Sequence, residues 1–297
     1  MEFGDYGVVR TPTLVSVIVP ARNVARTLTQ QLEAISGQDY PGPLELIVAV
    51  NGGRDRTAEV AARWVRRNKM GRVIDASDRL GPGYARNRGV GAARGDFLAF
   101  CDADDLVSHR WLRELVASAG DADLVTGPLS AEALNSEPLR SCQSVAPPSR
   151  KFHDFLPIAS TSNCGVWREV FDALGGFEEH GRVGGEDTSF SWLAQLSGYS
   201  ISVANDAVVH KRFRASRLAI FPQYFWYGIG DARLYSRFGP LGMPRRDVRE
   251  ALSEWAAIAR GVPSLAGTPG RWGRVLQMAA LDFGRTVGSV RYRSLFL

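Results

Sequence analysis

The segment LVSVIVP, residues 14–20, is short, almost entirely apolar and rich in β-branched side chains. Such a run is typical of a strand that is buried on both faces of a parallel sheet. Similar runs follow along the chain, at residues 44–50, more weakly at 72–75, at 97–101 and at 123–126. The sequence therefore predicts five strands in its first half.

Helical patterns separate these strands. We expect Asn23 and Ser108 to cap two of the helices, and the others to span about residues 57–67 and 84–93. Strand and helix alternate through Thr126, which predicts an α/β fold with a mostly parallel, mixed sheet flanked by helices. Ligands of such sheets bind at the carboxyl ends of the strands.

The second half of the chain is organised differently. Residues 127–150 are rich in Pro and Ser and indicate a long excursion or loop. A second block at 160–210 contains helical patterns and two closing strands. From residue 216 onward the pattern is helical and basic.

The composition is that of an ordinary globular protein, with 297 residues, 45% apolar and 23% charged. Three cysteines are too few for a disulfide framework, so we expect a reducing, cytoplasmic location. The acidic start, with Glu2 and Asp5, argues against a secretory signal peptide, and no apolar run reaches the length of a membrane span.

Charge is distributed unevenly along the chain. Residues 211–297 contain 15 Lys and Arg against 5 Asp and Glu, a net charge of +10, whereas the rest of the chain carries −5. Aromatic residues and arginines in this region, such as Trp272, Phe283 and Arg285, favour contact with an anionic membrane surface. The alternative is that these helices pack on the rest of the protein. Nucleic acid is not an expected partner, because no recognition-helix signature accompanies the charge.

Three carboxylates follow the fourth strand directly, at Asp102, Asp104 and Asp105. Mg²⁺ and Mn²⁺ prefer carboxylate oxygens, and this edge of the sheet is where ligands bind. The alternative is that these acids cap the next helix, where negative charge is favourable. A second Asp-x-Asp, at residues 121–123, precedes a strand and therefore lies at the wrong end for a site.

Three further segments belong to the same edge of the predicted sheet: PARN at 20–23, NGGRD at 51–55 and GPGYARNRG at 81–89. Glycine lets the backbone approach a phosphate closely, and a neighbouring arginine neutralises it. Each segment alone is also consistent with turns and surface arginines.

Taken in order, these motifs resemble family 2 glycosyltransferases of the GT-A fold over about residues 14–212. The shared elements are VSVIVPARN, Gly-x-x-Asp-x-Thr, ARNRG, DADD, GGF and GEDT. The resemblance implies a nucleotide-sugar donor, a divalent Mn²⁺ or Mg²⁺ cofactor and inversion at the anomeric carbon.

The resemblance also implies roles for particular residues. Asp187 would be the general base that deprotonates the acceptor hydroxyl, with Glu186 beside it. His210 would join Asp102 and Asp104 as a metal ligand, although a structural role for this histidine is the alternative. The residues implied in binding the nucleotide sugar are Pro20, Ala21, Asn23, Asn51, Gly83, Arg86 and Asp102.

These implications define two parts of the chain. Residues 1–212 would be the catalytic domain, with a nucleotide-binding half at about 14–126 and an acceptor-binding half at about 160–212; residues 213–297 would be a helical, basic extension. The enzyme would add one sugar to a glycan, a lipid-linked or a small-molecule acceptor, at the inner face of a membrane. Many relatives have two acids where Val50 and Asn51 stand here, so a non-catalytic nucleotide-sugar-binding protein is an alternative, as is a nucleotidyltransferase.

Overall fold

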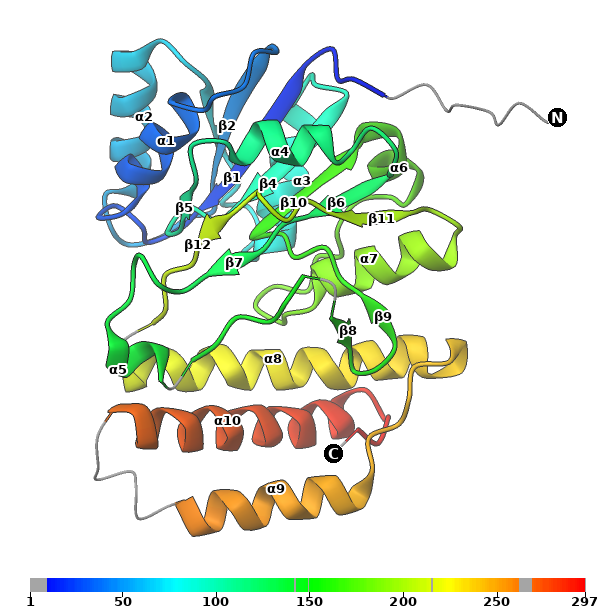
Figure 1. Ribbon diagram of the computed structural model, residues 1–297. Coiled ribbons are helices and arrows are strands. Elements are labelled where there is room, and N and C mark those ends of the chain that lie inside the picture. Colours follow the sequence, from blue (N-terminus) through cyan, green and yellow to red (C-terminus); the bar gives the residue numbers. More distant parts are fainter. Residues whose placement is uncertain (1–9, 142, 149, 215, 262–268, 297) are drawn as a thin grey trace, which may run out of the picture.

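The computed structural model describes residues 10–141, 143–148, 150–214, 216–261 and 269–296. Within them, the central sheet has seven strands in the order β11-β6-β10-β4-β1-β2-β3. Only β10 runs against its neighbours β4 and β6, which confirms the predicted mostly parallel, mixed sheet (Figure 1). The strands are β1 (Val15–Ala21), β2 (Leu44–Val50), β3 (Arg72–Asp75), β4 (Phe97–Cys101), β6 (Leu124–Thr126), β10 (Asn163–Trp167) and β11 (Ile201–Val203).

Helices connect these strands and pack on the sheet, and α1 and α2 lie side by side at one flank of it (Figure 1). The helices of this region are α1 (Leu28–Ser36), α2 (Thr57–Asn68), α3 (Pro82–Ala92), α4 (Trp111–Ala117), α6 (Arg168–Ala173) and α7 (Glu186–Leu196). The apolar face of α1, with Leu28, Leu32 and Ile35, is fully buried in the main core.

Two predicted helix caps are wrong. The helix α1 begins only at Leu28, and the Asn23 side chain instead accepts a hydrogen bond from the backbone N–H of Arg54 at 2.7 Å. Asn23 adopts a left-handed φ of +54°, which ends the extended backbone after β1. Ser108 lies three residues before α4 and makes no side-chain cap, because a turn intervenes before Trp111.

The predicted excursion at residues 127–150 holds short elements that build a second layer. The strand β7 (Leu129–Ser130) pairs with β12 (Val209–His210), which pairs in turn with β5 (Leu106–Val107). The helix α5 (Glu137–Arg140) follows β7, and a small hairpin joins β8 (Lys151–Phe152) to β9 (Leu156–Pro157). Pairing of β12 with β5 brings the chain after His210 next to the segment that follows β4.

The C-terminal region is helical, as predicted, and forms a separate layer against the sheet domain (Figure 1). Its helices are α8 (Arg217–Phe238), α9 (Val248–Gly261) and α10 (Pro269–Arg291), with a 3₁₀ turn, η1, at Gly239–Leu241. Glycines at 228 and 284 let α8 and α10 touch, because a Cβ on either would lie within 2.1 Å of a carbonyl oxygen on the other helix. Within the described residues, no helix is both long and apolar enough to cross a membrane.

Packing of α10 changes the residues available for a membrane contact. Trp272 is only 7% exposed and Arg285 only 8%, so neither side chain is free to meet a membrane surface. Arg285 pairs with Asp231 and Asp282, both at 2.9 Å. Phe283, at 48%, remains exposed. The expectation that Trp272 and Arg285 act at a membrane is therefore wrong. For these two residues the alternative holds, in which the helix packs on the rest of the protein.

Candidate functional site

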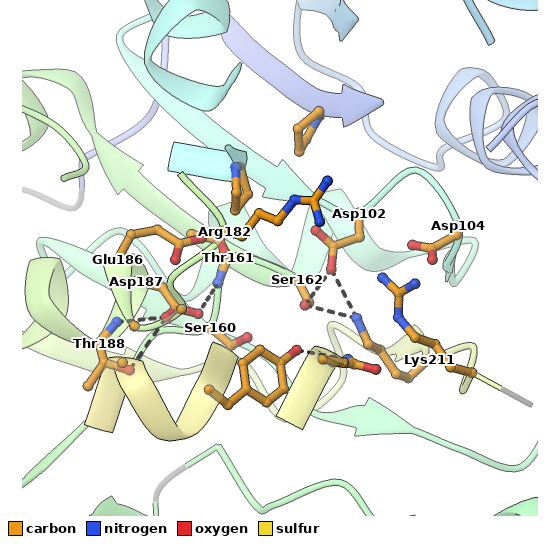
Figure 2. A pocket seen from close by; sticks show the side chains of 18 of the residues that line it. Asp102, Asp104, Ser160, Thr161, Ser162, Arg182, Glu186, Asp187, Thr188 and Lys211 are labelled. Atoms are coloured by element: carbon orange, nitrogen blue, oxygen red, sulfur yellow. Dashed lines mark hydrogen bonds and ion pairs between the residues drawn. The ribbon is translucent and has the colours of Figure 1, made fainter. Parts of the chain in front are cut away.

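A cavity of about 820 Å³ lies where the carboxyl ends of β1 and β4 face α8. It is lined by Asp102 and Asp104 on one side and by Asp187 on the other, as Figure 2 shows. The helix α8 contributes Tyr227 to the wall. The cavity is therefore enclosed jointly by the predicted catalytic domain and by the helical extension.

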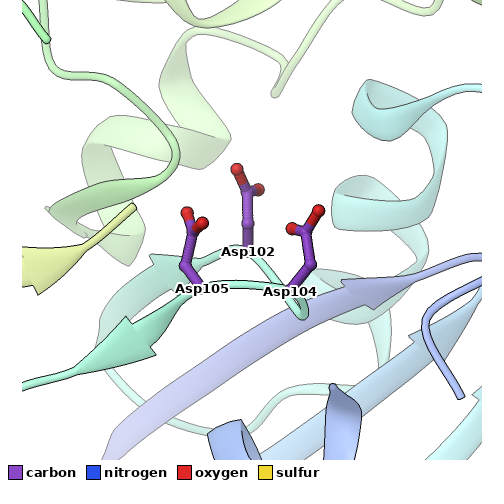
Figure 3. Close-up of side chains that lie close together, drawn as sticks. All are labelled: Asp102, Asp104 and Asp105. Carbon is purple, nitrogen blue, oxygen red and sulfur yellow. The ribbon is translucent and has the colours of Figure 1, made fainter. Parts of the chain in front are cut away.

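The three carboxylates after β4 converge, as Figure 3 shows. Oxygens of Asp102, Asp104 and Asp105 all lie within 4.8 Å of one another. The next helix, α4, begins only at Trp111, so these acids do not cap it and the capping alternative is wrong. Hard divalent cations take such carboxylate oxygens, so this donor set fits a divalent metal.

Two basic side chains hold Asp102 in place. Its Oδ1 accepts a bond from Arg86 at 2.8 Å, and its Oδ2 accepts bonds from Lys211 at 2.9 Å and from Ser162 at 2.7 Å. Asp105 is fully buried and accepts bonds from Lys211 at 2.9 Å and from the backbone N–H of Arg212 at 2.8 Å. The sequence analysis missed Lys211 and Ser162. A cationic run directly after a predicted strand, at 211–214, was the one signal for Lys211.

The pKa values of the three acids in the cluster shift in different directions. Burial disfavours ionisation of Asp102, but the positive charges of Lys211 and Arg86 outweigh it and lower its pKa below the ordinary value. Burial raises the pKa of Asp104 and of Asp105, and the negative charge of Asp102 adds to the effect. Part of this rise comes from repulsion between neighbouring carboxylates, which a further cation would relieve.

Arg86 joins the two acidic parts of the cavity. Its guanidinium lies 2.8 Å from Asp102 Oδ1 and 2.9 Å from Glu186 Oε1, and the residue is 4% exposed. Burial raises the pKa of Glu186, and the neighbouring charge of Asp187 raises it further, against the attraction of Arg86. The carboxylate of Glu186 is thus buried and held by a structural ion pair.

Asp187 differs from Glu186 in its partners. It lies in the first turn of α7, where its Oδ1 accepts the backbone N–H of Thr188 at 2.8 Å. Its Oδ2 accepts the N–H of Thr161 at 3.3 Å. Among the described residues Asp187 forms no ion pair, and it lines the cavity. Of the two acids, Asp187 is therefore the one whose carboxylate is available to a ligand.

Most residues expected to bind the nucleotide sugar come together at the same cavity. Pro20, Ala21, Asn23, Asn51 and Arg86 line it. Both ends of the Asn51 amide are already used by backbone: Nδ2 donates to the carbonyls of Ala76 and Arg79, and Oδ1 accepts from Gly81 N–H. Asn51 therefore anchors the 76–81 loop at the edge of the cavity.

Gly83 and His210 are not brought into the cavity. A Cβ on Gly83 would lie 2.4 Å from the carbonyl oxygen of Glu178, so this glycine permits close packing of α3. His210 lies on β12, outside the group of described acids that could share a metal. Its buried Nδ1 has no hydrogen-bond partner among the residues that the structure describes. A ligand role for His210 therefore stays a prediction, and Lys211 lies at the carboxylates.

The comparisons with known proteins agree with this geometry. The family model described as glycosyl transferase family 2 matches residues 16–175, more than half of the chain. Glycosyltransferase AglE of Haloferax volcanii is 29% identical over 210 residues, covering 67% of this chain and 66% of AglE. Glycosyltransferase AglD of the same organism is 30% identical over 273 residues, covering 85% of this chain and 40% of AglD. The chain thus spans about two thirds of the one relative and two fifths of the other.

Solved structures share the fold. Mannosyltransferase PcManGT from Pyrobaculum calidifontis, in complex with GDP-Man and Mn²⁺, superposes with a TM-score of 0.65 at 20% identity, covering 94% of this chain and 87% of that one. TarS 1–349 of S. aureus, in complex with UDP-GlcNAc, gives 0.55 at 18% identity, covering 94% and 92%. The order of motifs, the mixed sheet and the matched family model lead to one conclusion: the chain belongs to glycosyl transferase family 2 and has the GT-A fold.

Proposed function

We propose that the protein is an inverting glycosyltransferase that moves one sugar from a nucleotide-sugar donor to a hydroxyl group of an acceptor. The observation that carries this proposal is that Asp102, Asp104 and Asp187 line the same cavity, with Arg86 bonded to Asp102 and to the acid next to Asp187. The named ligands of two structural neighbours, GDP-Man with Mn²⁺ and UDP-GlcNAc, support a nucleotide-sugar donor here.

Asp102 and Asp104 would hold a divalent cation, Mn²⁺ or Mg²⁺, whose charge would stabilise the departing diphosphate. Other residues of the chain orient these groups and bind the nucleotide. Arg86 keeps Asp102 ionised and oriented, and Asn51 holds the loop beside the nucleotide. Cationic side chains that line the cavity, among them Arg22, Arg182 and Arg214, add positive charge for the diphosphate.

Asp187 would accept the proton of the acceptor hydroxyl as this oxygen attacks the anomeric carbon. Thr188 and Thr161 donate backbone hydrogen bonds to its carboxylate and orient it. Direct attack from the side opposite to the leaving diphosphate inverts the anomeric configuration. Positioned carboxylate bases contribute roughly 10²–10⁴-fold to such proton transfers.

For the acceptor we propose a chemical class, and for the site of action a membrane surface. A glycan, a lipid-linked or a small-molecule acceptor would enter beside Asp187. The helical extension would bring the protein to an anionic membrane surface at the cytoplasmic side. Exposed residues near the end of α10, Phe283, Val290 and Arg291, support this contact.

The experiment that tests the function is a screen of nucleotide sugars, with and without Mn²⁺, for donor hydrolysis and for transfer to an acceptor panel. Release of a nucleoside diphosphate together with glycosylated product supports the proposal. Donor binding without product for any acceptor would favour a non-catalytic nucleotide-sugar-binding protein. Pyrophosphate release from a nucleoside triphosphate and a sugar phosphate would favour a nucleotidyltransferase instead.

A further inference from the structure

The ammonium group of Lys211 lies among the carboxylates that the proposed metal site uses. Its Nζ is 2.9 Å from Asp102 Oδ2, 2.9 Å from Asp105 Oδ2 and 3.2 Å from Ser162 Oγ. Figure 2 shows the contacts with Asp102 and Ser162. An ammonium group has three N–H donors, and these three contacts use all of them. Lys211 is thus coordinated by oxygen atoms much as a bound cation is.

The carboxylates of the cluster require a positive charge at the position of Lys211. Carboxylates held this close repel one another, and burying them without a counter-charge is costly. Lys211 Nζ lies 2.9 Å from Asp102 Oδ2 and 2.9 Å from Asp105 Oδ2, so its positive charge meets two of these carboxylates directly. Before ligands bind, the side chain is therefore a counter-ion of the cluster.

At this position, Lys211 competes with a divalent cation for Asp102. A divalent cation at Asp102 would meet a positive charge already hydrogen-bonded to one of that residue's oxygens. Two cations that share an anionic oxygen repel each other strongly in a partly buried site. Binding of the metal is therefore favourable only if the ammonium group has another anion to move to.

Lys211 and its neighbour Arg212 differ in the groups that they contact. The Lys211 side chain lines the cavity and is 23% exposed, and its stem has four flexible methylene groups. Arg212 donates from Nε to the carbonyl of Asp104 at 2.9 Å and from a terminal nitrogen to Gln30 at 3.2 Å. Of these two cations, Lys211 is therefore the one that contacts a carboxylate of the proposed metal site.

We propose that Lys211 is an internal counter-cation, which neutralises Asp102 and Asp105 before ligands bind and passes to the donor diphosphate when the metal takes its place. The inference rests on the proposed function, because it requires a metal-dependent nucleotide site. It makes the metal and the nucleotide bind cooperatively: each ligand favours the arrangement of Lys211 that the other one requires.

Removing the charge of Lys211 provides the test, because the two affinities should change in opposite directions. In Lys211→Met, Mn²⁺ alone should bind about tenfold tighter or more, since its competitor is gone. Nucleoside diphosphates, tested as ADP, CDP, GDP, UDP and dTDP in the presence of Mn²⁺, should bind more weakly. Titration calorimetry and the electron paramagnetic resonance signal of free Mn²⁺ measure both affinities without any turnover.

Matched variants separate charge from structure. Lys211→Arg keeps the charge and should retain a wild-type affinity for Mn²⁺ alone. Lys211→Gln removes the charge but stays polar, and should behave like Lys211→Met if the apolar variant does not fold. Asp104→Asn should remove the Mn²⁺ site from each background. A purely structural role for Lys211 would instead weaken binding of both ligands.

The outcomes distinguish this inference from the function on which it rests. Suppose that the wild-type protein binds a nucleoside diphosphate with Mn²⁺, but a folded, uncharged variant binds Mn²⁺ alone no tighter than wild type. The role of Lys211 is then overturned and the proposed function stands. If the wild-type protein shows no Mn²⁺-dependent binding to any nucleotide of the panel, the metal assignment fails, and the inference fails with it.

Discussion

The acidic cluster after β4 and the Glu186–Asp187 pair at the start of α7 share one cavity but differ in how their charge is neutralised. In the cluster, Lys211 lies between two carboxylates and Arg86 holds Asp102. In the pair, Arg86 holds Glu186, whereas the hydrogen bonds to the Asp187 carboxylate from described residues come from backbone N–H groups and a hydroxyl. A cation beside a carboxylate favours its ionised form and makes it a weaker base, so the acid without such a partner is the better candidate for proton transfer.

The largest effect should come from the acid without a cation. Asp187→Asn removes the proposed base while keeping its shape, so transfer should fall by roughly 10²–10⁴-fold. Donor affinity should change little, because the base acts only when the acceptor attacks. Steady-state transfer rates and donor titration measure the two quantities. If Glu186→Gln is inactive and Asp187→Asn turns over normally, the roles of the two acids are exchanged.

The next effect should come from the residue that links the two acidic groups. Arg86→Met leaves Asp102 and Glu186 without their shared partner, and breaking a buried ion pair from one side costs about 3–5 kcal/mol. The free energy of unfolding from denaturant titration should fall by about this amount. Arg88→Met on the exposed side of the same helix is the control and should change stability little. Equal stability of the two variants would refute the bridging role of Arg86.

Removing one charge from the cluster should weaken ligand binding rather than the fold. Asp104→Asn keeps the size of the side chain but removes a carboxylate that a hard cation requires. We expect Mn²⁺-dependent nucleotide affinity to fall by at least about 10- to 100-fold, the range that loss of an outer ligand partner already causes. Asp121→Asn, an exposed acid of the second Asp-x-Asp, should leave affinity unchanged. An unchanged affinity in Asp104→Asn would refute this metal ligand.

The smallest effect concerns the exposed arginines at the C-terminal end of the helical extension. Arg291→Glu and Arg293→Glu should each weaken binding to anionic vesicles at low salt by about 1 kcal/mol per charge removed. Raised ionic strength should weaken it further, because these residues are exposed. Cosedimentation with phosphatidylserine and with neutral phosphatidylcholine vesicles measures the difference. Equal binding to both vesicle types, or to neither, would refute an electrostatic contact.

How far the sequence predicts the structure depends on the range of the interactions involved. The strands at residues 44–50 and 97–101 were predicted to the residue, because apolar runs bounded by turns report burial on both faces of a sheet. The caps at Asn23 and Ser108 were wrong, because the turns that precede α1 and α4 are longer than the local pattern suggests. Helix boundaries depend on tertiary contacts such as the bond from Arg54 to Asn23.

The candidate site shows the same division. Asp102, Asp104 and Asp187 could be proposed from motif order, since their residue types and their places after a strand or at a helix start are local properties. The role of Asn51 could not, because its amide is consumed by the backbone of the 76–81 loop, which lies far along the chain. Trp272 and Arg285 were misassigned for a related reason: spacing reports a helix but does not report which of its faces another helix covers.

Alternating apolar and amphipathic segments, with acids after one buried run, were sufficient to predict the α/β sheet and the edge at which its ligands would bind. They could not predict that Lys211 would lie among Asp102, Asp105 and Ser162, because those contacts arise only when β12 pairs with β5. Nor could these local patterns predict that α8 would line one wall of the cavity. Strand burial and the position of an acid after a strand depend on residues that are close together in the sequence. The neutralisation of a buried charge depends instead on which distant segments the fold brings within a few ångströms of it.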